Sequence, residues 1–72
     1  MTVKGNRWIY DKTSNSKTLR DKHNQTVAFV YADFSVSFRS EMSWWSTMER
    51  AMAEAVNKAE AAGIVLAPIG RE

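Results

Sequence analysis

An α+β fold is predicted for this chain: a small antiparallel β-meander of three to four strands that packs on one amphipathic α-helix. Between Thr26 and Phe38 every second residue from Ala28 onward is apolar, which is the period of a strand. From Ser40 to Ile64 apolar residues recur every three or four positions, which is the period of a helix. Because 72 residues make one domain at most, residues 1–72 are expected to form a single domain.

The N-terminal part is expected to form two strands joined by a polar turn. Residues 5–11 contain the large apolar run Trp8, Ile9 and Tyr10 and give the first strand. Residues 12–17 are rich in turn-forming Ser and Asn and predict the turn. Residues 17–21 give a weaker strand with Leu19 as its single apolar anchor.

A second turn is predicted over residues 21–25. Asn24 is its natural left-handed residue, because Asn tolerates positive φ better than other non-glycine residues. The alternating segment 26–38 is long beside the usual strand of about 5–6 residues. We therefore expect it to bend, or to break into two strands, near Ala32 and Asp33.

The helix is predicted to bury a stripe built around its methionines. At about 100° per residue this stripe collects Trp45, Met48, Met52, Val56 and Ala59. Small residues widen the stripe on one flank, where Trp44 also lies: Ala51, Ala55 and Ala62. The helix should therefore place Trp45 in the core and leave Trp44 beside small alanines.

Both ends of the helix have sequence signals. Ser40, Ser43 and Ser46 are candidate N-caps, and Ser46 has capping-box spacing to Glu49. Gly63 is a well-placed stop. Residues 64–69 are apolar again and allow a short C-terminal edge strand, since Pro68 excludes a central one.

Two features indicate a protein-binding surface. The second face of the long strand begins apolar, with Val27, Phe29 and Tyr31, although one helix can cover only one sheet face. That second face should be exposed, or covered by a second copy of the chain or by a partner. Trp44 is either a contact residue, as tryptophan often is in interfaces, or folded over the helix alanines.

Catalysis and cofactor binding are not expected. His23 is the single histidine and lies in a predicted turn, where it makes a poor general base. The carboxylates Asp11, Asp21 and Asp33 lie at strand ends, where such residues usually cap turns, and they have no metal-ligand spacing. There are no cysteines for a thiolate zinc site, and the three glycines are too far apart for a phosphate-binding loop.

The charge distribution raises nucleic-acid binding as an alternative. Residues 1–39 hold seven Lys and Arg against three Asp, whereas residues 40–72 hold three against five Glu. Trp8 and Tyr10 could stack on bases between the basic residues of the first hairpin. Those basic residues are Arg7, Lys12, Lys17, Arg20 and Lys22. The other interpretation is a solvated hairpin with no ligand.

Neither a membrane partner nor secretion is expected. No apolar run approaches the roughly 18 residues needed to span a bilayer. The first residues, MTVKGNRWIY, have no apolar signal region, which predicts a cytoplasmic protein.

From Trp8 to Pro68 the chain resembles small proteins encoded in phage and prophage accessory regions. An aromatic strand comes first, and an Ala-rich helix ends near the pair Ala67 and Pro68. Between them lies a hairpin that reads L-x-D-x-x-N-x-x-V-A-x-V, with Leu19, Asp21, Asn24, Val27, Ala28 and Val30 at the fixed positions. Gly is more usual in those proteins where Asn24 stands, and residues 31–44 form an insertion relative to the pattern.

The resemblance implies a non-enzymatic protein that acts by binding. Anti-CRISPR proteins and other anti-defence inhibitors have this size and build. It implies a host protein or protein–nucleic acid complex as the partner, in the host cytoplasm. A homodimer, and a small nucleic-acid-binding protein that uses the basic hairpin, remain the other hypotheses.

Overall fold

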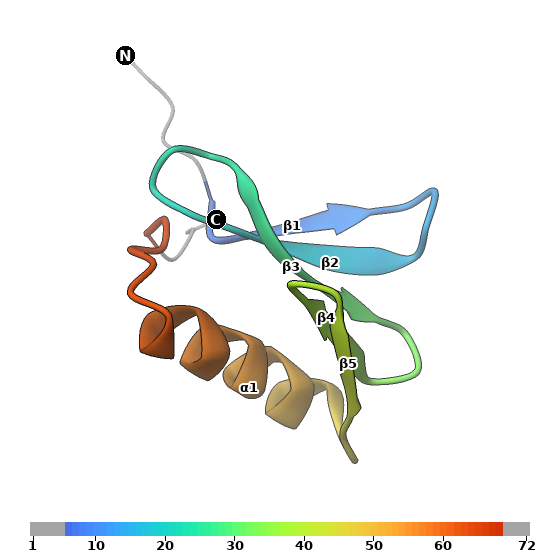
Figure 1. The fold of residues 1–72 in the computed structure, drawn as a ribbon. Helices are drawn as coiled ribbons and strands as arrows, with labels where there is room; N and C mark the ends of the chain where they lie inside the picture. Colours follow the sequence, from blue (N-terminus) through green and yellow to red (C-terminus); the bar gives the residue numbers. More distant parts are fainter. Residues whose placement is uncertain (1–5, 69–72) are drawn as a thin grey trace.

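Five strands and one helix make up the computed structural model, which describes residues 6–68. The strands are β1 (Trp8–Asp11), β2 (Ser16–Arg20), β3 (Thr26–Tyr31), β4 (Ser35–Phe38) and β5 (Glu41–Trp44). Each strand pairs antiparallel with the next one along the chain, which gives the sheet order β1-β2-β3-β4-β5. The helix α1 (Met48–Ala61) follows and packs on one side of this twisted meander (Figure 1).

The α+β meander with a single packed helix is therefore confirmed, but the expected number of strands is wrong. The helix that the sequence predicts from Ser40 begins only at Met48, because residues 41–44 form β5. Arg39 and Ser40 both have positive φ, at 51° and 71°, and make the two-residue loop between β4 and β5. Positive φ at both central residues is the signature of a type I′ hairpin turn, which reverses the chain into another strand.

The long alternating segment breaks into β3 and β4, at the position expected from the sequence. Ala32, Asp33 and Phe34 form the loop, and the amide of Phe34 donates to the carbonyl of Tyr31 at 2.9 Å. Phe34 has φ of 70°, an uncommon conformation for a bulky residue. The alternation survives the turn because Val30 and Val36 are direct partners on the same face.

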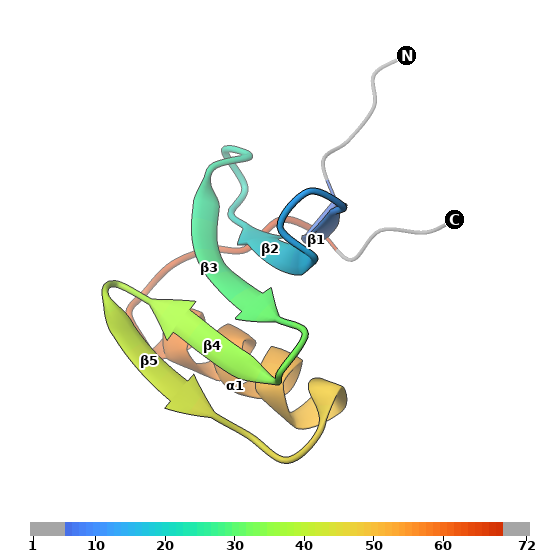
Figure 2. The ribbon, with the colours of Figure 1, turned by 90° about the vertical axis from the view of Figure 1, so that its right-hand side faces the viewer.

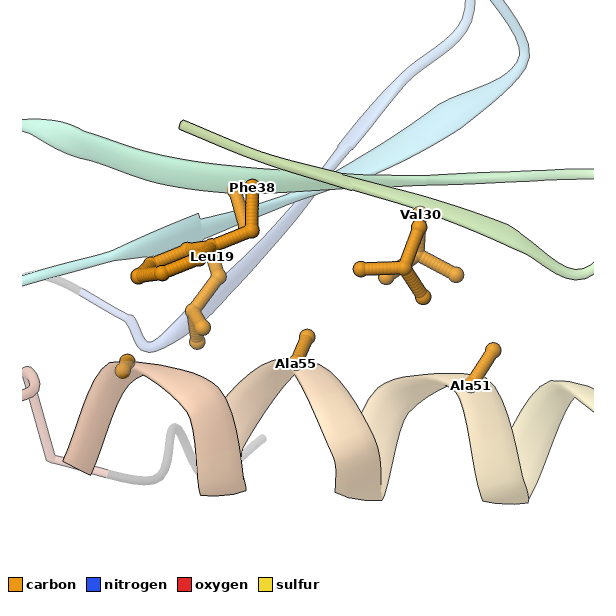
Figure 3. Packing of buried hydrophobic residues seen from close by; sticks show 8 residues of the cluster. Leu19, Val30, Phe38, Ala51 and Ala55 are labelled. Atoms are coloured by element: carbon orange, nitrogen blue, oxygen red, sulfur yellow. The ribbon is translucent and has the colours of Figure 1, made fainter. Parts of the chain in front are cut away.

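The core lies between the helix and the central strands β3 and β4 (Figure 2). The sheet supplies Leu19, Ala28, Val30, Val36 and Phe38, and Figure 3 shows Leu19, Val30 and Phe38 directed toward the helix. Ala51, Ala55 and Ala59 are fully buried on the helix side. Met48, Met52 and Val56 are only partly buried around them.

The expected stripe is therefore inverted, with alanines at its centre and methionines at its margin. Ala51, Ala55 and Ala59 are spaced by four residues, which is one of the ridges along which helices pack. Small side chains on this ridge let the helix backbone approach the sheet closely, and larger neighbours then fill the edges of the contact.

The helix termini differ from the expectation at one end and agree at the other. Thr47, and none of the three serines, is the N-cap: its Oγ1 accepts from the amide of Arg50 at 3.1 Å. At the C-terminus Gly63 has φ of 81°, its amide donates to Glu60, and the amide of Ile64 donates to Ala59. These two bonds form a Schellman motif, so Gly63 ends the helix as predicted.

The predicted C-terminal edge strand is reduced to a single bridge between Asp21 and Leu66. Backbone hydrogen bonds from Lys22 to Val65 and from Ala67 to Arg20 hold this segment against the end of β2. The amide of Arg7 also donates to the carbonyl of Pro68 at 3.0 Å. The last described residues therefore join the first ones beside the sheet; residue 69 lies outside the described part.

Candidate interaction surface on the open face of the sheet

One face of the sheet carries the helix, and no other element of residues 6–68 covers the opposite face. We call this opposite side the open face. Residues directly paired across antiparallel strands point to the same side of the sheet. The register therefore fixes one row of the open face, running Ile9, Thr18, Phe29, Ser37 and Met42. A second row contains the pairs Ser16–Tyr31 and Ser35–Trp44.

Large and small side chains alternate from strand to strand across this face. On β3 and β5 they are large: Phe29 is 39% exposed, Met42 45% and Trp44 66%. On β2 and β4 they are small hydroxyl residues, and Ser16, Thr18 and Ser35 are almost completely shielded. The large side chains on β3 and β5 therefore project further from the sheet than the serine and threonine side chains on β2 and β4.

The aromatic rings on β3 form a continuous apolar ridge. Phe29 and Tyr31 lie two residues apart on one strand, with ring centroids 6.1 Å apart and an interplanar angle of 22°. This spacing is within the range of stacked aromatic pairs. Val27 does not extend the ridge, because it is the extra residue of a bulge opposite Leu19 and Arg20 and packs against the core.

Trp44 and Trp45 lie in different environments. The chain is extended at this point, not helical, so successive side chains point to opposite sides of the sheet. Trp44 is the last residue of β5 and its side chain belongs to the open face, so its predicted place on a helix flank is wrong. Trp45 is partly buried against the core, and its Nε1 donates to Ser43 Oγ at 2.9 Å. The structure therefore brings the exposed tryptophan and the exposed sheet face together into one surface.

The turns at the ends of this surface are fixed by aspartates, as the sequence predicts. Asp33 Oδ1 accepts from the hydroxyl of Ser35 at 2.6 Å and from the amide of Ser35 at 3.0 Å. These hydrogen bonds hold the pKa of Asp33 below its usual value. The Ser35 hydroxyl therefore already donates its proton to Asp33, and this donor is not free for a ligand on the open face.

Asp11 and Asp21 cap their own turns in the same way. Asp11 accepts from the amide of Thr13, and Asp21 accepts from the amides of His23 and Gln25. The bond from Gln25 contributes most to a lowered pKa of Asp21. His23 is an exposed turn residue, and Asn24 has φ of 65°, as expected.

The basic residues of the first hairpin do not gather into one patch. Arg7 Nε donates to the carbonyl of Ala67, and Arg20 Nη1 donates to the carbonyl of Asn24. Both guanidinium groups thus hold loops in place. Lys17 is paired with Tyr10 on the side opposite the open face, and its Nζ lies 5.5 Å from the centre of that ring.

The remaining two lysines are exposed but lie at opposite ends of β2. Lys12 is in the turn before this strand, and Lys22 is in the turn after it. A strand of five residues separates the two turns by roughly 17 Å. Arg7 and Arg20 are neighbours, since the Arg20 amide donates to the Arg7 carbonyl, but the guanidinium groups of both residues are already engaged by backbone carbonyls. The three lysines lie apart from this pair, so the five predicted contact residues do not form one free basic patch.

Neither a metal centre nor a membrane span is found in the described part of the chain. Residues 6–68 contain no group of three or more His, Asp or Glu that could hold a metal ion. Within the same residues, α1 is too short and too polar to cross a bilayer.

Comparison with known proteins adds no assignment. No protein-family model matches the chain, and no curated protein or solved structure matches it. The resemblance to phage accessory proteins therefore stays a prediction that rests on the residue pattern alone.

Proposed function

We propose that this is a small non-enzymatic protein that binds another protein through the open face and thereby inhibits or modulates it. The observation that carries the proposal is the exposure of Trp44 on the same sheet face as Phe29 and Met42, a face that no described element covers. Contiguous exposed apolar side chains mark interaction sites on small soluble domains. Tryptophan is among the residues most enriched in binding hot spots.

The way the chain distributes its large side chains supports this proposal. The largest fully buried side chains are only Leu19, Val30 and Val36, and the helix contributes alanines to the core. A domain of this size has little apolar surface available for stability. Keeping Trp44, Phe29 and Met42 outside the core therefore indicates a use other than stability.

The charge of the open face favours a protein over a nucleic acid as the partner. Both rows between Ile9 and Trp44 are made of apolar, aromatic and hydroxyl side chains. The register and the alternation of the strands place two charged residues at the ends of this face: Asp11, the last residue of β1, and Arg20, the last residue of β2. A phosphate backbone requires cations to neutralise it, and the Arg20 guanidinium already donates to the carbonyl of Asn24.

Inhibition of a host complex is the form of this activity that the phage-type resemblance supports. The target class is then a cytoplasmic host protein, such as a component of a CRISPR–Cas system or of another defence or nucleic-acid-handling complex. An apolar face on a small rigid sheet suits this role, because it can cover an assembly surface without a conformational change of its own.

Affinity capture from host lysate with a matched pair of variants tests the proposal. Trp44→Ala and Phe29→Ala should each lose the captured partner, and both should keep the melting temperature of the original chain. Tyr10→Ala is the control, because Tyr10 is 55% exposed but lies on the other side of the sheet. A partner that binds Trp44→Ala as well as the original, or that is lost equally with Tyr10→Ala, would contradict the proposal.

Gel-shift titration at two salt concentrations distinguishes protein binding through the open face from the alternative, nucleic-acid binding through the basic hairpin. Binding through Lys12, Lys17 and Lys22 would weaken steeply as salt rises. We expect no shift at low salt. A salt-sensitive shift that survives Trp44→Ala and is lost when the lysines are replaced would favour the basic hairpin instead.

A further inference from the structure

The outer edge of β5 is free of any strand partner in the described structure, because β5 ends the sheet order. Its loop to β4 contains only Arg39 and Ser40, so Phe38 and Glu41 close a turn in which the first carbonyl bonds the last amide. Hydrogen-bonded and non-bonded pairs then alternate along β5. Met42 and Trp44 are therefore the residues whose backbone N–H and C=O groups point away from β4.

This edge lacks the features that usually prevent strands from adding to one another. Natural edge strands are protected by charged side chains, proline, bulges or a covering loop. The other edge, at β1, has Asp11 at its end, and residue 68 is bonded beside its start. On β5, by contrast, Met42, Ser43 and Trp44 are uncharged, and Glu41 points to the helix side.

We propose that two copies of this chain pair antiparallel through their β5 edges, about a two-fold axis at Ser43. Opposed residues in such a pair must lie on the same side of the sheet, so Met42 of one copy faces Trp44 of the other. Both residues direct their backbone groups outward. The two symmetry-related pairs therefore exchange roughly four hydrogen bonds.

The neighbouring register is much poorer. With the axis at Met42, Trp44 would lie opposite Ser40 of the second copy. Ser40 has φ of 71° and belongs to the turn, so it cannot continue a ladder. Only the Ser43 axis uses both outward-facing residues of this short strand.

The side chains are compatible with this register. On the open face, the thioether of Met42 meets the indole of Trp44 from the second copy, a favourable sulfur–aromatic contact. The axis carries two small Ser43 residues, each already bonded to its own Trp45. The two Glu41 carboxylates are separated by four positions along the strands, or about 13 Å, so like charges do not face each other.

The dimer joins two open faces into one. Each Trp44 extends the surface of the other copy, and two positions along the ladder bring the two indoles within about 8 Å of each other. The strand contact alone buries far less than the roughly 1,200 Å² of stable complexes. Association is therefore weak, with a dissociation constant on the order of 100 µM.

Sedimentation equilibrium from about 10 µM to about 1 mM tests the pairing. The original chain should pass from monomer to dimer across this range. Met42→Pro should remain monomeric, because proline removes an outward-facing N–H and leaves the ladder to β4 intact. Met42→Lys is the second variant, in case the proline alters the hairpin, and should weaken association at least tenfold. Phe29→Ala, far from the edge, should dimerise normally.

Amide exchange gives the residue-level readout. The amides of Met42 and Trp44 should become protected at high concentration and exchange freely at low concentration. A chain that stays monomeric at about 1 mM would overturn the proposal, as would a folded Met42→Pro variant that still dimerises. Loss of the dimer in Phe29→Ala would overturn it too, by showing face-to-face contact. These outcomes are independent of partner capture, since sedimentation and amide exchange follow the purified chain with no partner present.

Discussion

Ser35 and Trp44 are direct partners on neighbouring strands, yet Ser35 is 2% exposed and Trp44 is 66% exposed. Two adjacent residues on one sheet face differ this much because one side chain is small and engaged by Asp33, while the other stands clear of its neighbours. Such pairs of one large exposed and one small shielded side chain make the open face uneven.

Replacing the two adjacent tryptophans should have unequal effects on stability. Trp44→Ala should change the free energy of unfolding by no more than about 0.5 kcal/mol, because it removes an exposed side chain. Trp45→Ala should cost about 2–3 kcal/mol, since it removes contacts with the core and the bond to Ser43. Thermal denaturation followed by circular dichroism measures both. Equal losses would place both indoles in the core.

Enlarging the alanine ridge of α1 should destabilise the domain. Ala55 is fully buried between the helix and the sheet, so Ala55→Leu should push the two apart and cost about 1–3 kcal/mol. Ala53→Leu, on the exposed side of the same helix, is the matched control and should stay within about 0.5 kcal/mol. Urea denaturation of the three proteins provides the comparison; an unaffected Ala55→Leu variant would mean that the helix does not pack through its alanines.

The turn between β4 and β5 offers a stabilising change. Ser40 has φ of 71°, a conformation that costs a non-glycine residue about 1–2 kcal/mol. Ser40→Gly should therefore raise the unfolding free energy by about 0.5–1 kcal/mol, after the greater freedom of glycine in the unfolded chain is subtracted. Ser40→Val should lower it, because a β-branched residue tolerates this region poorly. If both substitutions destabilised the protein equally, the turn would have another conformation.

Acid should weaken the domain through its turn aspartates. The pKa values of Asp21 and Asp33 are held below 3.8 by hydrogen bonds from Gln25 and from Ser35, respectively. Groups with a depressed folded pKa stabilise the folded state above the unfolded value, and lose this contribution as pH falls through the folded value. The loss should therefore begin below about pH 4.

A pair of variants isolates this effect. Asp33→Asn and Asp21→Asn should each be less stable than the original chain at neutral pH, and should show a shallower loss between pH 4 and pH 2, roughly the range in which these carboxylates titrate. Urea denaturation at several pH values measures both slopes. Lys12→Gln leaves the turns intact and should keep the original slope.

The meander and its breaks were accessible from the sequence because local chemistry determines them. Alternation identified β3 and β4, aspartates marked the turns, and Gly63 marked the end of α1. The position of Asn24 followed from its tolerance of positive φ. In each case the signal and the structure lie within a few residues of each other.

The strand β5 was missed because its signals are weak and overlap those of a helix. Arg39 and Ser40 are poor predictors of a type I′ turn, for which Asn-Gly is the usual sequence. Trp45 and Met48 also fit the helical stripe that continues through Met52. The alternation of Met42, Ser43 and Trp44 was the remaining clue, and four residues are too few to decide between the two periods.

The surface was predicted in part. An exposed second sheet face was one of the expected outcomes, and exposure of Trp44 was one of the two alternatives for that residue. That both lie on the same side of the sheet depends on β5 and could not be derived without this strand. The engagement of Arg7 and Arg20 depends on the C-terminal segment. A residue sixty positions away in the sequence provides Arg7 with its acceptor, and no local pattern contains that information.

The junction of Arg7 with residues 67 and 68 also has a kinetic consequence. All five strands are joined by short local hairpins, and such contacts form early because the loops that must close are short. The hydrogen bonds of Arg7 to Ala67 and Pro68 close the longest loop in the described chain. Folding should therefore proceed from the hairpins toward the helix and finish at this junction, which is also where the native structure should first open.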